Sequence, residues 1–215
     1  VEGRAVASLF EPASDQEAQE RRSEEAFTEA KSLWISEGVS KASEVIALLT
    51  RVPEESPASF EKEIILALIE ASKKGRTIQA ITRVQKAMLL KRPDLDDESM
   101  MRLEAWLGAM ESENGSPENA RALFSELEKK VALREKDRTP AQVSLVASLG
   151  VASVPTRTQL ILNQAELSER LQKWGDAAAA YSRAVEAKLG GNRAAFGFAR
   201  SLLKNGEAAD REKAF

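Results

Sequence analysis

Cysteine and histidine are both absent from the 215-residue sequence. Their absence excludes disulfides, thiol nucleophiles, imidazole general bases and the commonest zinc ligands. Carboxylates, hydroxyls and amines are the groups that remain for chemistry. Aromatic residues are also few, at 5%. The chain is therefore predicted to be non-enzymatic and to hold no cofactor or metal, unless a catalytic domain lies beyond residue 215.

An excess of charge of one sign is also missing, because 31 basic residues face 34 acidic ones and the net charge is -3. A chain without a strong positive field is not drawn to nucleic acid phosphates. No stretch approaches the roughly 20 apolar residues that a membrane-spanning helix needs. We expect a soluble segment without nucleic acid binding or direct membrane insertion, and its composition does not separate a cytoplasmic from a periplasmic location.

Catalytic and ligand motifs are few and weak. The glycine-rich phosphate-binding patterns are absent, and S-x-x-K occurs only at Ser59–Lys62 and Ser201–Lys204, without its usual companion motifs. The acidic cluster at 94–98 lacks the alternating ligands and central glycine of a calcium loop. Capping of a helix start explains those carboxylates better, since they favour exposed N–H groups.

Helix-forming residues dominate the sequence, which is 43% hydrophobic and 30% charged. Hydroxyl–proline pairs such as Ser116-Pro117 mark helix starts, and Gly38, Gly75, Gly115 and Gly206 mark helix ends. Residues 143–154 are rich in valine and fit either a short helix or an extended connector, with helix preferred. The predicted helices are 16–36, 40–51, 57–74, 77–91, 96–113, 117–136, 140–149, 156–172, 175–188, 192–204 and 207–215.

An internal repeat runs through these helices. A small residue on one helix is followed twelve positions later by alanine on the next, and then by apolar residues four and three positions further. This spacing keeps the residues on one helix face and lets two antiparallel helices cross closely. The sets are Ala30/Ala42/Ile46/Leu49, Leu68/Ala80/Val84/Ala87, Gly108/Ala120/Phe124/Leu127 and Ala165/Ala177/Tyr181/Ala184.

The repeat resembles the tetratricopeptide repeat (TPR) family. ILNQAELSERLQKWGDAAAAYSRAVEA (161–187) has Ala165, Trp174, Ala177, Tyr181 and Ala184 in register, and segments 115–127 and 73–93 share that register. The resemblance implies an all-α, right-handed superhelical solenoid of antiparallel helical hairpins. The offsets between units differ from the family's period of 34 residues, which implies insertions.

The predicted organisation has four parts: a flexible lead-in at 1–15, hairpins at 16–136, an irregular spacer or single helix at 137–155, and hairpins at 156–215. The last hairpin is truncated at Phe215, which implies that the natural protein continues.

In the TPR family the first helices of successive hairpins line a concave groove in which partners bind. The version that captures a C-terminal carboxylate needs polar groove positions, and this chain has apolar residues there. The resemblance therefore implies a scaffold or adaptor that binds a helical or extended apolar segment of another protein. The predicted partner-binding residues are Lys62, Ile65, Leu66, Ile69, Arg102, Ala105, Trp106, Ala109, Leu162, Asn163, Glu166, Phe196 and Arg200.

Two alternatives stay open. The groove could be closed by the chain's own N-terminal segment or by the 137–155 spacer, because large exposed apolar patches are rare on monomers. Alternatively, the repeat could be a structural spacer or oligomerisation module of a bacterial envelope assembly, such as a secretion, pilus or exopolysaccharide-export apparatus, with self-association.

Overall fold

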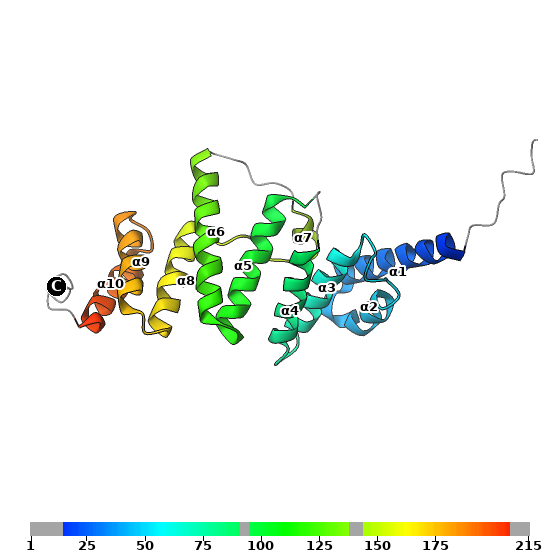
Figure 1. Cartoon of the computed structure of the whole chain (residues 1–215), viewed down its shortest axis with the longest axis horizontal. Coiled ribbons are helices and arrows are strands. Elements are labelled where there is room, and N and C mark those ends of the chain that lie inside the picture. The colour runs from blue at the N-terminus through cyan, green and yellow to red at the C-terminus, as the bar shows by residue number, and fades with distance from the viewer. Residues whose placement is uncertain (1–14, 91–94, 138–143, 207–215) are drawn as a thin grey trace, which may run out of the picture.

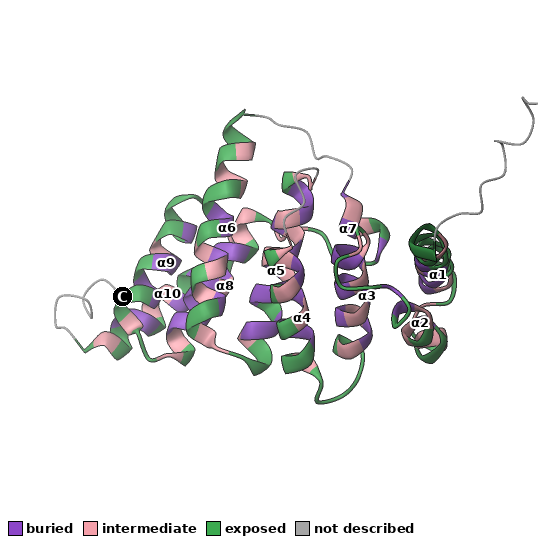
Figure 2. Cartoon of the chain, turned by 45° about the vertical axis from the view of Figure 1, so that its right-hand side comes forward, coloured by how far each residue is buried: buried purple, intermediate pink, exposed green. Residues whose placement is uncertain are grey.

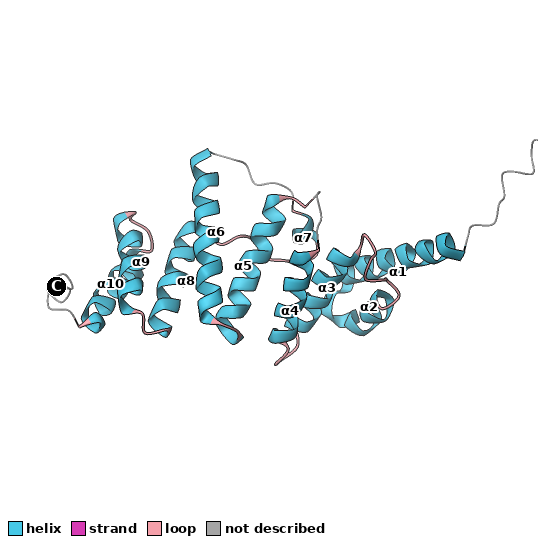
Figure 3. Cartoon of the chain, in the orientation of Figure 1, coloured by secondary structure: helices cyan, strands magenta, loops and turns pink. Residues whose placement is uncertain are grey.

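The computed structural model describes residues 15–90, 95–137 and 144–206, and in this part of the chain it contains helices and no strand (Figure 3). The predicted all-α class is thereby confirmed. The lead-in at 1–14 and the predicted helix at 207–215 lie outside the described residues. The elements are α1 (Asp15–Glu37), η1 (Gly38–Lys41), α2 (Ala42–Leu49), α3 (Ser59–Ala71), α4 (Thr77–Leu89), α5 (Asp97–Asn114), α6 (Pro117–Asp137), α7 (Leu145–Ser148), α8 (Arg157–Arg170), α9 (Trp174–Glu186) and α10 (Gly191–Asn205).

The helices stand in a row, and neighbours in the sequence pack on one another (Figure 1). α3 packs on α4, α5 on α6, α8 on α9, and α9 on α10. α6 also packs directly on α8, and α7, which lies between them in the sequence, packs on α5. This packing is compatible with an α-solenoid.

Small residues allow the close approach of successive helices, as the repeat predicted. Ala80, Ala120 and Ala165 are fully buried. Figure 2 shows which parts of each helix carry the buried residues. A Cβ atom added to Gly197 of α10 would lie 2.3 Å from Cζ of Tyr181 on α9. Only glycine therefore permits the observed distance between α9 and α10.

Local signals set several helix boundaries. Thr156 and Gln159 form a reciprocal capping box at the start of α8, which satisfies exposed N–H groups of the first turn. Gly206 ends α10 in a left-handed conformation with φ of 78°. Gly115 ends α5 as predicted, but with a φ of -112° and not in the left-handed conformation typical of a glycine cap.

Two predicted helices differ from the structure. The range 40–51 begins with the 3-10 turn η1, and α2 covers only Ala42–Leu49. Within 140–149, helix is confined to Leu145–Ser148 among the described residues, because Ser144 caps it and Gly150 has a φ of 102°. Residues 152–156 then run to α8 without regular structure.

Candidate functional site

The predicted partner-binding residues lie on α3, α5, α8 and α10, and the structure divides them by exposure. Ala109, Phe196 and Arg200 are exposed. Ile65, Ile69, Ala105 and Leu162 are buried. The half-buried ones are Lys62, Leu66, Arg102, Trp106, Asn163 and Glu166.

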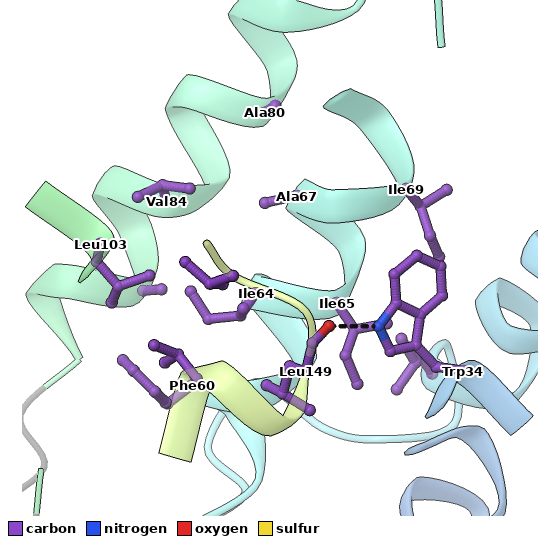
Figure 4. Close-up of a cluster of buried hydrophobic side chains, with 14 of the residues drawn as sticks. Trp34, Phe60, Ile64, Ile65, Ala67, Ile69, Ala80, Val84, Leu103 and Leu149 are labelled. Carbon is purple, nitrogen blue, oxygen red and sulfur yellow. Dashed lines mark hydrogen bonds between the residues drawn. The ribbon is translucent and has the colours of Figure 1, made fainter. Parts of the chain in front are cut away.

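The segment Ser144–Val151, here called the strap, accounts for much of the burial at the N-terminal end. Its side chains Val146, Leu149 and Val151 belong to the same buried cluster as residues of α1, α3 and α5. Figure 4 shows Leu149 of the strap beside Trp34 of α1 and Phe60 of α3. The chain therefore fills this surface with its own residues.

Polar contacts hold the main chain of the strap in place. Nε1 of Trp34 donates a hydrogen bond of 2.9 Å to the carbonyl oxygen of Leu149 (Figure 4). Nη1 of Arg102 on α5 donates to the carbonyl oxygen of Val151 at 3.2 Å. The N–H of Leu145 points to Oδ2 of Asp96 at 3.4 Å. Side chains of α1 and α5 thus bind the strap through its backbone.

Ile65 and Ile69 were predicted to line an open groove, but both side chains are fully inaccessible to solvent. They pack in the cluster that contains Trp34 and the strap. Ala105 packs with the α6 side chains of its own cluster, and Leu162 packs with Ala194. Helical periodicity placed these residues on an apolar face, and other parts of the chain cover that face.

Three of the half-buried predicted residues have partners within the chain. Leu66 and Trp106 pack against the core cluster at its edge. Nζ of Lys62 donates to the carbonyl oxygen of Val52 at 2.5 Å, and burial lowers the pKa of this lysine. These side chains are already committed to intramolecular contacts.

A different surface remains open between α5 and α8. Ala109, Asn163 and Glu166 line a depression of about 240 Å³ together with Phe124 and Arg170. Nη1 of Arg170 donates to the carbonyl oxygen of Ser112 at 2.6 Å, which joins the two helices across this depression.

α10 carries an exposed aromatic side chain. Phe196 is 72% exposed. Arg193 and Arg200 lie on the same side of α10, three and four positions from it. Nε and Nη2 of Arg200 donate to Glu169 of α8 at 3.0 and 2.6 Å, and this bonding raises the pKa of the guanidinium. Arg193 donates to Glu166 in the same way.

Several buried carboxylates elsewhere in the described chain have cationic partners, whereas Glu111 accepts from the N–H of Ser116 at 2.7 Å. Glu63 accepts from Arg83 at 2.8 Å, and Glu128 accepts from Arg183 at 2.8 Å. Asp96, from the acidic cluster, caps α5 by accepting from the N–H of Ser99 at 2.7 Å. Within residues 15–90, 95–137 and 144–206, no group of three potential metal ligands occurs, and no helix is long and apolar enough to cross a bilayer.

Sequence reasoning missed Trp34 and the strap as parts of the candidate site. Trp34 follows the repeat residue Ala30 by four positions and so shares its helix face. The strap had a visible signal, since residues 143–154 are unusually apolar for a connecting segment. Their mutual contact joins residues 115 positions apart, which no local pattern reveals.

Comparison of the chain with models of known protein families and with curated protein sequences gave no match. The likeness to the TPR family therefore rests on the residues of the repeat.

Proposed function

We propose that the chain is a non-enzymatic protein-interaction scaffold built from TPR-like hairpins in a right-handed superhelix. It binds a helical or extended apolar segment of a partner protein on its first-helix surface. The observation that carries the proposal is the exposure of Phe196 on α10, between two arginines that carboxylates of α8 hold in place.

A few residues carry most of the binding energy of a protein interface, and arginine and large aromatic residues are enriched among them. Phe196 offers a rigid apolar surface. The ion pairs of Arg193 with Glu166 and of Arg200 with Glu169 already restrict both arginine side chains, so these side chains lose less conformational entropy when a partner binds. The depression lined by Ala109 and Asn163 lies further along the same row of helices, on α5 and α8. This surface fits a partner that packs an apolar side chain against Phe196 and makes polar contacts with Arg193 and Arg200.

A photoreactive amino acid at position 196 tests the proposal in the cells from which the protein comes. Leu89 of α4 is the matched control position, because it is 81% exposed on a helix predicted to be second in its hairpin. We expect position 196, and not position 89, to crosslink one discrete protein. With the purified pair, Phe196→Ala should weaken binding at least tenfold while Leu89→Ala has no effect. Identical crosslinks at both positions would refute the proposal.

A structural spacer or oligomerisation module is the second candidate function. Leu203 is 42% exposed and lies two helical turns from Phe196, so both face the same direction. An apolar pair of this kind also fits another copy of the chain. Light scattering separates the two functions: a mass that rises with concentration and returns to that of the monomer in Phe196→Asp favours self-association.

A further inference from the structure

The strap presents the pattern of a bound peptide to α1, α3 and α5. Its buried residues are Ser144, Val146, Leu149 and Val151, whereas Ser148 and Gly150 between them are exposed. Three aliphatic side chains thus enter the core cluster at spacings of three and two residues, and Ala147 between the first two is half-buried. A surface that accepts three anchors at such spacing selects for side-chain shape.

The same surface recognises main-chain atoms. Trp34 and Arg102 donate to the carbonyl oxygens of Leu149 and Val151, which are two residues apart. Every residue of a peptide has a carbonyl group, so these two bonds place no demand on the ligand's sequence. Peptide recognition by strand addition likewise combines affinity from main-chain bonds with selection by side-chain pockets. Here the bound segment contains the helical turn Leu145–Ser148 and is held by side-chain donors.

The path of the chain does not require the strap. α6 packs directly on α8, and in Figure 1 the end of α6 and the start of α8 lie on the same side of the row. The return segment 152–156 is exposed or half-buried and has no regular structure. A short linker between α6 and α8 would leave the contacts of the row in place.

We propose that the strap is an internal ligand, and that it covers a peptide-binding site formed by α1, α3 and α5. A partner segment with aliphatic residues at the spacing of Val146, Leu149 and Val151 replaces it there. This inference rests on the proposed scaffold function and adds a second site, separate from Phe196. An internal ligand lowers the apparent affinity for a partner, because the site is free only for a fraction of the time.

Peptide binding in trans tests the inference. In a strap-free variant, residues 138–155 are replaced by a short Gly/Ser linker, and fluorescence anisotropy measures binding of a labelled peptide of residues 144–153. We expect binding at least tenfold tighter than to the intact chain. The same peptide with aspartate in place of Leu149 should not bind, and Trp34→Phe in the strap-free variant should weaken binding. A folded strap-free variant that does not bind the peptide overturns the inference.

A second pair of variants keeps the test decisive if the strap-free chain does not fold. Leu149→Ser loosens the strap in the intact chain, and Ser148→Ala changes an exposed neighbour as the control. Leu149→Ser should bind the peptide at least tenfold more tightly than Ser148→Ala does. Equal binding, or loss of the fold in both the strap-free and Leu149→Ser variants, overturns the inference. Crosslinking at position 196 reports separately on the scaffold function, because Phe196 does not contact the strap cluster.

Discussion

Single residues set the distances between helices in this protein. Gly108 of α5 faces the ring of Phe124 on α6, and Gly197 of α10 faces the ring of Tyr181 on α9. In both places an added Cβ atom would lie less than 3 Å from an aromatic carbon. The ring of Tyr181 is itself fully buried and has little room to move.

Substitution of Gly197 by alanine should destabilise the chain by about 1–3 kcal/mol, the usual cost of overpacking a core. Gly175 is the matched control, since the nearest atom to its added Cβ is 3.7 Å away. Gly175→Ala should be neutral or stabilising by up to about 1 kcal/mol, because alanine favours helix. Urea unfolding of the two variants measures both values. Equal effects would contradict the packing seen between α9 and α10.

Trp34→Phe should cost about 1 kcal/mol more than Trp106→Phe. Both changes remove an indole, but Trp34 also donates the bond to Leu149, and its loss leaves a buried carbonyl oxygen with one partner fewer. Thermal or urea unfolding gives the difference. Hydrogen exchange at the strap should rise in Trp34→Phe only. If the two variants lose equal stability, the bond between Trp34 and the strap contributes nothing.

At the scale of the element, Asp96 connects α5 to the strap. Its carboxylate accepts from the N–H and Oγ of Ser99 at 2.7 and 2.6 Å, and it also faces the N–H of Leu145. Burial tends to raise the pKa of Asp96, but these hydrogen bonds outweigh it and hold the pKa below the ordinary value. One side chain thus caps a helix and orients the strap.

Because the pKa of Asp96 is lowered in the folded chain, its ionised form stabilises the fold above the ordinary aspartate value of about 3.9. That contribution is lost as the pH falls through the folded value. Asp96→Asn keeps an N-cap acceptor and should remove this part of the acid sensitivity. Urea midpoints between pH 7 and 3 measure it.

Glu126→Gln is the control for the titration of Asp96. Glu126 also has a lowered pKa, caused by its hydrogen bond to Lys129, but both side chains are exposed. Solvent-exposed pairs of this kind contribute little to stability. If Glu126→Gln reduces the pH dependence of the urea midpoint as much as Asp96→Asn does, the ionisation of Asp96 is not what stabilises the fold.

At the scale of the whole molecule, the two ends of the row differ in how they are joined. The strap connects α1, α3 and α5 through residues far apart in the sequence. α10 packs on α9 and, more lightly, on α8. The stability of a row of helices is the sum of the stabilities of its units and of the interfaces between neighbours. A substitution at one end of the row should therefore leave the stability of the other end unchanged.

Hydrogen exchange in the Gly197→Ala variant tests this separation. Exchange should accelerate in α9 and α10, and less in α8, while α1, α3 and α4 keep the rates of the unchanged chain. The reason is that the substitution weakens only the contact with Tyr181 and its neighbours. Uniform acceleration across all helices would show instead that the row unfolds as one cooperative unit.

The sequence by itself determined the helical class, most helix positions and the small residues between neighbouring helices, because these depend on local periodicity and capping. Ala165, Ala177 and Tyr181 are buried where the repeat predicts. Only the tertiary structure decided which apolar faces stay open. Periodicity shows that Ile65 needs an apolar neighbour but does not identify that neighbour. Trp34 and the strap cover that face through contacts between distant residues, whereas Phe196 on the amphipathic helix α10 stays exposed.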